Sequence, residues 1–431
     1  MTITTLEPVE PLDPLEPVEQ ELQHAHVVTG HGAESAEWNV AGFLAGRGHD
    51  ASTAWVDGHR RFTHAELRGA ATAIADALRE RGIQRGDPVA LLAGNGFFWV
   101  AAYLGILGAG MIAVPLSTDD DATEARRRAG WAGCRAVTLG QGQRWPTGDT
   151  AVPSLAEVDL PVGWDRTPAP SLDAAPVRAG ADAVYVFTPG TLGQPRAVRI
   201  THDNIRANTE SILDCLYLES SDRTLAVVPF TEAFGASLLH THLRIGAALV
   251  RHQSTTIPET IVGSLERFNC TGFAGAPTVY SALVRNSSFT LRRLPQLRML
   301  QQAGRSLAPV IDEEVARAHP SARLFVMYGQ TEATATLSHL PVEERGRRAA
   351  SIGRGIPGVR LRVVDAGGAD VRTGDVGEIW ATGGNISPGY LHDDIATART
   401  MQGGVLRTGD LATVDDDGYI YLVDRPALHP R

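Results

Sequence analysis

Cysteine and clustered basic residues are both scarce in this chain. Only three cysteines occur among 431 residues, and Cys134, Cys215 and Cys270 lie far apart. This spacing argues against a disulfide framework or a zinc site and is typical of reduced packing residues. The formal net charge is -10, the pI is about 5.8, and no long basic run is present. Nucleic acid and anionic membranes are therefore disfavoured as main partners.

Long apolar runs and targeting signals are also missing. No apolar stretch approaches the length of a membrane span. The first residues have neither the basic nor the apolar region of a secretory signal, so we expect a cytoplasmic protein. The patterns His-Glu-x-x-His, Cys-x-x-Cys and Gly-x-Ser-x-Gly are absent as well. Their absence weakens a hydrolase or metalloenzyme interpretation.

The remaining composition is ordinary for a globular protein, with 43% hydrophobic and 20% charged residues. We expect an acidic, proline-rich flexible tail at residues 1–35. Residues 36–180 and 181–345 alternate strand and helix patterns, which predicts an α/β fold with two parallel-rich, doubly wound subdomains. Residues 346–431 contain short strands joined by Gly and Asp turns, which predicts a small β-barrel-like subdomain.

Local patterns predict two further features. Thr63 and Glu66 form a capping box ahead of a helical pattern, and Gly82 supplies the stop at its end. His240 and His242 are two positions apart on a predicted helix, so they do not share a face. We expect these two histidines to be packing or polar-face residues and not a metal pair.

Residues 185–204, YVFTPGTLGQPRAVRITHDN, form the stretch around which the chain is organised. An apolar run predicts a buried strand, a turn with two glycines follows, and Arg196 opens the return strand. Glycines let the backbone approach a ligand, and free N–H groups and hydroxyls can face phosphate oxygens. No Gly-Lys-Ser/Thr opens a helix here, so the loop is not of the Walker type. Taken alone, such a loop is most often a plain turn.

Four more motifs follow predicted strands or begin the next helix. In open α/β sheets, ligands collect beyond the carboxyl ends of the strands, so all five segments can face one crevice. The four motifs are residues 229–235, 275–280, 302–305 and 327–332, and the later motifs are residues 377–379, 389–390, 407–411 and 424–425.

This series resembles the acyl-adenylate-forming superfamily, which includes acyl-CoA synthetases, adenylation domains of nonribosomal synthetases and luciferases. The likeness runs from about residue 39 to residue 425. Its most specific parts are Tyr-Gly-Gln-Thr-Glu at 328–332 and Arg-Thr-Gly-Asp-Leu at 407–411. The details look most like acyl-CoA or aryl-acid ligases. The resemblance implies the large N-terminal domain of that fold and an acid-activating, AMP-forming ligase.

The resemblance also implies a role for each matching residue. Tyr328 would stack on adenine, since a flat ring covers a base at low entropic cost. Thr331 would contact the α-phosphate, and Glu332 would help to hold Mg²⁺, which prefers oxygen ligands. The implied catalytic residues are Thr188, Thr191, Arg196, Thr331 and Glu332. The implied nucleotide-binding residues are Gly190, Gly193, Gly304, Arg305, Tyr328, Gly329, Gln330, Asp410 and Arg425. The implied substrate pocket contains Glu232, Phe234, Gly235, Gly275 and Ala303.

The implied reaction is in-line attack by a small or medium carboxylic acid on the α-phosphorus of ATP. It yields an acyl-adenylate and pyrophosphate, and catalysis is mainly positioning and charge neutralisation. ATP and Mg²⁺ are the implied cofactors. CoA, a carrier protein or an amine stays open as the acceptor. A separate C-terminal domain acting in trans and a homodimer stay open as partners.

The sequence departs from the family in three ways. Pro189 and Leu192 replace hydroxyl residues of the loop, and Arg196 replaces its lysine, which keeps the charge but not the compact ammonium. Glu232 stands where an aromatic residue or histidine is usual. We hypothesise a substrate with an amine or a hydrogen-bond donor there, and a solvated or paired surface glutamate is the alternative. The small C-terminal domain, which normally supplies a lysine, is expected to be absent.

Two other functions stay open. Some relatives are thought to activate nitrite, so another oxyanion is an alternative substrate. A non-catalytic nucleotide-binding or scaffold protein is the second alternative, favoured by the altered loop. Each site residue alone has an ordinary explanation, such as core packing for Tyr328 or a helix N-terminal acid for Glu332. The order of the whole set along the chain favours the enzyme.

Overall fold

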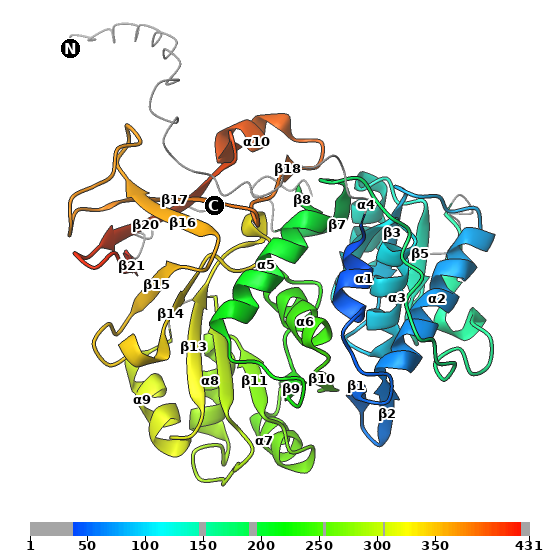
Figure 1. Cartoon of the computed structure of the whole chain (residues 1–431), viewed down its shortest axis with the longest axis horizontal. Helices are drawn as coiled ribbons and strands as arrows, with labels where there is room; N and C mark the ends of the chain where they lie inside the picture. The colour runs from blue at the N-terminus through cyan, green and yellow to red at the C-terminus, as the bar shows by residue number, and fades with distance from the viewer. Residues whose placement is uncertain (1–37, 146–151, 189–195, 253–255, 305–306, 424–431) are drawn as a thin grey trace, which may run out of the picture. The chain divides into compact units, whose positions relative to one another are not determined.

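The computed structural model describes residues 38–145, 152–188, 196–252, 256–304 and 307–423 (Figure 1). The tail predicted at residues 1–35 lies outside these ranges. Within them, no helix is both long and apolar enough to cross a membrane. All three cysteines are described, and each is a free thiol, as the sequence predicts.

The helices begin and end at recognisable signals. In α2 the side chains of Thr63 and Glu66 make both hydrogen bonds of the capping box, and Gly82 follows the helix with φ of 81°. Both features confirm the prediction. The α-helices are α1 (Val40–Ala45), α2 (His64–Glu80), α3 (Phe97–Gly108), α4 (Ala122–Trp131), α5 (His202–Cys215), α6 (Ala233–Ile245), α7 (Pro258–Arg267), α8 (Pro277–Asn286), α9 (Pro309–Ala318) and α10 (Asp394–Thr400).

The smaller sheet has the strand order β18-β8-β7-β4-β3-β5-β6. Its strands from β7 through β4, β3 and β5 to β6 run parallel, and β8 turns back antiparallel on β7. Its members are β3 (Pro88–Leu92), β4 (Ile112–Leu116), β5 (Ala136–Leu139), β6 (Ser154–Ala156), β7 (Asp182–Thr188), β8 (Arg196–Thr201) and β18 (Gly389–Tyr390).

The larger sheet has the order β16-β17-β20-β21-β15-β14-β13-β12-β11-β9-β10-β1-β2, and β19 pairs with β20. Its strands from β13 to β1 run parallel. The two parallel-rich sheets with helices confirm the predicted α/β fold. The strands are β1 (Thr53–Asp57), β2 (Arg60–Thr63), β9 (Arg223–Ala226), β10 (Ala248–Arg251), β11 (Gly272–Gly275), β12 (Met299–Ala303), β13 (Arg323–Tyr328), β14 (Ser338–Leu340), β15 (Ser351–Gly355), β16 (Val359–Val364), β17 (Gly377–Gly383), β19 (Met401–Gln402), β20 (Val405–Val414) and β21 (Ile420–Leu422).

The two sheets exchange strands across the proposed subdomain boundary at residue 180. The early strands β1 and β2 join the larger sheet through β10, whereas β7 and β8 complete the smaller one. Helix α1 contacts α3, α5 and α6, and Figure 1 shows these helices between the sheets. Local periodicity does not show which distant strands will pair. The sequence pattern therefore predicts a boundary near residue 180 but not the exchange of strands across it.

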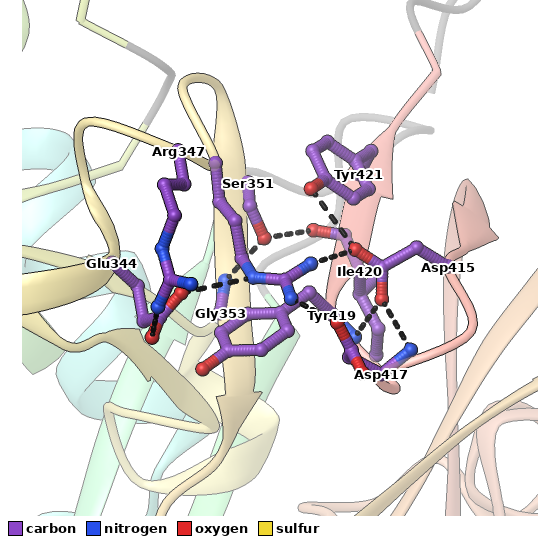
Figure 2. A network of polar contacts seen from close by, with 10 residues as sticks. Glu344, Arg347, Ser351, Gly353, Asp415, Asp417, Tyr419, Ile420 and Tyr421 are labelled. Atoms are coloured by element: carbon purple, nitrogen blue, oxygen red, sulfur yellow. Dashed lines mark hydrogen bonds and ion pairs between the residues drawn. The ribbon is translucent and has the colours of Figure 1, made fainter.

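The strands after β14 form an antiparallel extension of the larger sheet, which is where the small β subdomain is predicted. Figure 2 shows a polar network that ties this extension together. The Nε of Arg348 donates to Glu344 at 3.1 Å, and its terminal nitrogens pair with Asp415 and Asp417 in the turn between β20 and β21. Arg348 therefore fixes the end of β20, the strand that carries Asp410.

The two histidines of α6 are buried, which selects the packing role from the two that the sequence left open. The hydroxyl of Tyr103 lies 2.8 Å from Nε2 of His240, and that of Thr224 lies 2.8 Å from Nε2 of His242. Each imidazole thus has a polar partner on a different element, which satisfies a buried polar group inside an otherwise apolar core.

Candidate active site

A cleft of about 510 Å³ opens at the carboxyl ends of β4 and β7 of one sheet and β12 and β13 of the other. A volume of this size is ordinary for a small-molecule site. Four of the five predicted motif segments contribute to it, and residues 275–280 do not. The predicted residues in its lining are Thr188, Glu232, Phe234, Ala303, Gly304, Tyr328, Gly329, Gln330 and Thr331.

The turn after β13 is held by tight packing and by a long-range hydrogen bond. Gly329 has no room for a side chain, since a Cβ would lie 2.7 Å from the carbonyl carbon of Ala335 and closer still to its oxygen. Tyr328 is buried, and its hydroxyl donates to Oδ2 of Asp410 at 2.9 Å. The predicted adenine platform and the predicted ribose acceptor therefore lie together, although 82 residues separate them.

Glu332 lies in the single helical turn that follows, Thr331–Ala333, just beyond the lining. The hydroxyl of Tyr390 donates to its Oε1 at 2.7 Å. Burial, and then the charge of Glu332, raise the pKa of Tyr390, so the phenol stays a donor. Thr334 has φ of 66°, an uncommon value for a residue with a Cβ, and its hydroxyl bonds the carbonyl of Asn385 at 2.7 Å. Residues 385–390 thus hold this turn in one conformation.

Arg196 begins β8 directly opposite Thr188, its strand partner at the end of β7. Its guanidinium lies 3.5 Å from the carboxylate of Asp393 and 5.0 Å from the centre of the Tyr390 ring. Tyr390 therefore contacts both Arg196 and Glu332. The other predicted residues of the loop and its surroundings lie outside the described residues: Gly190, Thr191, Gly193, Arg305 and Arg425.

The residues present fit a magnesium ion that arrives with a nucleotide. The described part of the chain holds no group of three or more His, Cys, Asp or Glu side chains placed to bind a metal. Mg²⁺ usually binds one or two carboxylates together with water and substrate phosphates, and seldom an all-protein cage. Glu332, with one oxygen fixed by Tyr390, offers such a carboxylate beside the cleft.

Two polar side chains of the lining have no partner in the described ranges. Nε2 of Gln330 is buried there without a hydrogen bond. Glu232 precedes α6 without capping it, and partial desolvation raises the pKa of its carboxyl. An unsatisfied buried donor costs about 1–3 kcal/mol. The buried Gln330 amide therefore points to a ligand that carries an acceptor, whereas Glu232 is exposed to solvent, as in the alternative that the sequence left open.

The remaining predicted pocket residues divide into two pairs. Phe234 and Ala303 line the cleft, whereas Gly235 and Gly275 are buried and lie outside its lining. A Cβ on Gly235 would come within 2.6 Å of the carbonyl carbon of Pro229. Glycine at 235 is thus needed to close the turn into α6, and its place in a substrate pocket stays a prediction.

Sequence reasoning missed Ser117 and Arg128 in the lining and the contact of Tyr390 with Glu332. Arg128 belongs to a run of three arginines at 126–128, which does not show which of them faces the sheet. The Gly-Tyr motif at 389–390 is visible in the sequence, but its partner 58 residues away is not.

Known proteins resemble this chain in both sequence and fold. The family model of the AMP-binding enzyme matches residues 44–391. Feruloyl-CoA synthase from Amycolatopsis sp is 30% identical over 393 residues, which cover 87% of this chain and 75% of that protein. The complex structure of VinN with L-aspartate has a TM-score of 0.78 at 25% identity, covering 90% of this chain and 99% of that chain. The N-terminal domain of FACL13 from Mycobacterium tuberculosis has a TM-score of 0.81 at 22% identity, over 90% of this chain and 100% of that domain.

Proposed function

Because the chain belongs to the AMP-binding enzymes, a family of AMP-forming acid–CoA ligases, we propose that it adenylates a small or medium carboxylic acid with ATP. The products would be an acyl-adenylate and pyrophosphate. One observation supports this most strongly. The end of β7, with Thr188, and the turn after β13, with Tyr328 and Thr331, line a single cleft.

The cleft walls suggest how the reactants lie. Tyr328 would cover the base, and Asp410, bonded to it, would accept from the ribose. The acid would lie toward Phe234 and Ala303, with its carboxylate facing the α-phosphate near Thr331. One carboxylate oxygen attacks the α-phosphorus, the bond from that phosphorus to the bridging oxygen breaks, and pyrophosphate leaves with the electron pair. Positioning and charge neutralisation lower the barrier.

Charge at the phosphates would be neutralised from two sides. Mg²⁺, when bound, supplies positive charge at the phosphate oxygens. Glu332 would hold it, and the hydrogen bond from Tyr390 keeps that carboxylate oriented. Thr188 and Arg196, paired across β7 and β8, would approach the phosphates from the opposite wall.

We further propose that Glu232 selects an acid that also carries an amine or another donor. Its carboxylate lines the cleft and forms no ion pair with a described residue, and a simple anionic acid beside it would be repelled. The complex of VinN with L-aspartate is an example of this fold with an amine-bearing acid. In Glu232→Gln, the preference for an amino acid over its deaminated analogue should fall about tenfold. An unchanged preference would remove this proposal.

The test of the proposed function is MgATP-dependent pyrophosphate release by this chain. The panel contains aliphatic, aryl and amino acids together with nitrite, and Glu332→Ala is the control. We expect release with at least one carboxylic acid and its loss in the control. Release with nitrite alone would favour the other oxyanion. ATP binding without release from any substrate would favour a non-catalytic relative. CoA, added after adenylation, tests the acceptor.

A further inference from the structure

Arg128 is a cation in the cleft that none of the motifs above assigns. It comes from the last turn of α4 and lines the cleft together with Phe187 and Thr188. Its guanidinium carbon lies 5.5 Å from the centre of the Phe187 ring, the residue just before Thr188. Arg128 therefore stands beside the end of β7, where the loop expected to hold phosphates begins.

Two carboxylates fix the orientation of this guanidinium. Its Nε donates to Oε1 of Glu124 at 2.7 Å, and its Nη1 lies 3.0 Å from Oδ2 of Asp120. No described residue bonds its remaining terminal nitrogen, Nη2. The side chain is 27% exposed, so it is held in place and still reachable from the cleft. A guanidinium anchored on one edge keeps donors on the other edge for a ligand.

The ligand that fits this position is a phosphate group. Arginine forms strong charge-assisted hydrogen bonds to phosphate oxygens, and the triphosphate of ATP carries most of the negative charge that enters the cleft. The loop carries Pro189 and Leu192 at positions where the family resemblance implies hydroxyl residues. A second cation on this wall would replace part of the lost phosphate binding.

We propose that Arg128 binds the β- and γ-phosphates of ATP and stabilises the pyrophosphate leaving group. This inference rests on the proposed adenylation. When the α-phosphorus accepts the acid, the bridging oxygen leaves with the electron pair and its charge grows on pyrophosphate, next to this guanidinium. Arg128 neither gains nor loses a proton in the step. It has no role toward AMP, which lacks both outer phosphates.

The experiment compares nucleotide binding, so it needs no knowledge of the acid. Dissociation constants of AMP and of a non-hydrolysable α,β-methylene ATP are measured by calorimetry for the wild type, Arg128→Ala, Arg128→Lys and Arg127→Ala. Arg127 is a matched control, because it lies on the same helix, pairs with the same Glu124 at 2.7 Å, is 43% exposed and does not line the cleft. Thermal melting of each variant checks folding.

We expect Arg128→Ala to weaken binding of the ATP analogue about 10–100-fold, as for loss of a charge-assisted hydrogen bond, and AMP binding less than twofold. Arg128→Lys should lie between, and Arg127→Ala should match the wild type. Equal loss for both nucleotides, or no loss for either, would overturn the proposal and leave Arg128 as part of a structural ion-pair cluster. If Arg128→Ala does not fold, Arg128→Lys decides by the same ratio. Failure of pyrophosphate release in the wild type would instead count against the proposed function, because the binding ratio does not depend on it.

Discussion

The two walls of the cleft are held in different ways. On the β13 wall, Tyr328 is bonded to Asp410 and Glu332 to Tyr390, across 82 and 58 residues of sequence. On the α4 wall, Arg128 is held by Glu124, four positions earlier on the same helix. A pair of this kind forms with the helix itself and contributes about 0.2–0.5 kcal/mol to it. A long-range bond forms only when distant segments have packed, so the contacts that hold the β13 wall need the whole fold, whereas the pair of Arg128 with Glu124 can form within the helix.

We expect the largest effect from a change at Gly329, which lies in the turn after β13. In Gly329→Ala the new Cβ would overlap the Ala335 carbonyl, so the turn must move. We expect at least a 100-fold loss of pyrophosphate release and a loss of about 3 kcal/mol in the free energy of unfolding. Denaturant titration and the release assay measure both. Gly346→Ala, whose Cβ meets nothing within 4 Å, should behave as the wild type. Wild-type activity in Gly329→Ala would show that the wall is not rigid.

Tyr390→Phe removes one long-range bond and leaves the fold in place. Without the phenol, Glu332 loses the donor that orients Oε1. We expect the Mg²⁺ concentration for half-maximal pyrophosphate release to rise about tenfold, since residues that orient a metal ligand commonly change metal affinity by this much. Tyr421→Phe is the control, because its hydroxyl bonds Asp415 at 3.1 Å in the network of Figure 2 and not the cleft. An unchanged Mg²⁺ dependence in Tyr390→Phe would contradict the assigned role.

Arg348→Ala tests whether the ion pairs of Arg348, which lie away from the cleft, affect nucleotide binding at the β13 wall. Removing Arg348 leaves Asp415, Asp417 and Glu344 without their shared cation. We expect the melting temperature to fall by a few degrees and ATP affinity to change less than threefold, because Tyr328 still holds Asp410. Arg347→Ala removes a side chain that is 75% exposed and pairs with the same Glu344, and it should melt as the wild type does. If ATP affinity instead fell by more than threefold, β20 would be positioned mainly by this network.

We expect the smallest effect at His240, which lies away from the cleft and influences how stability depends on pH. Burial lowers the pKa of His240 from 6.5 to about 3. As pH falls below 6.5 the unfolded chain takes up this proton while the folded chain does not, so stability decreases as pH falls from 6.5 toward 3. Between pH 7 and pH 5.5, this histidine should lower the free energy of unfolding by about 1 kcal/mol.

Denaturant titrations at several pH values measure this slope, and His240→Gln should reduce it. Part of the slope should persist, because burial also lowers the pKa of His242 to about 4. ATP affinity at pH 7 should stay within twofold of the wild type, since His240 contacts Tyr103 and does not line the cleft. An equally steep slope in His240→Gln would assign the acid sensitivity to other groups.

Local sequence patterns predict much of the fold and the central residues of the site. The α2 helix was predictable because Thr63 and Glu66 lie three residues apart and bond each other's backbone. The convergence of Thr188, Gly304 and Tyr328 was predictable because each follows or ends a strand pattern, and carboxyl strand ends meet at one edge of a sheet. Chain order and residue type sufficed for these features, since every interaction involved is local or follows from sheet geometry.

Packing between distant segments decided the rest. Pairing of β1 with β10, the bond from Tyr390 to Glu332 and the packing role of Gly235 each join residues whose proximity has no sequence periodicity. The phase of α4 against the sheet, and not its run of arginines, places Arg128 in the lining of the cleft, which does not include Arg127. By itself the sequence determined which chemical groups this protein has and in what order. Only tertiary structure decided which of them meet, because burial and long-range strand pairing set the distances between them.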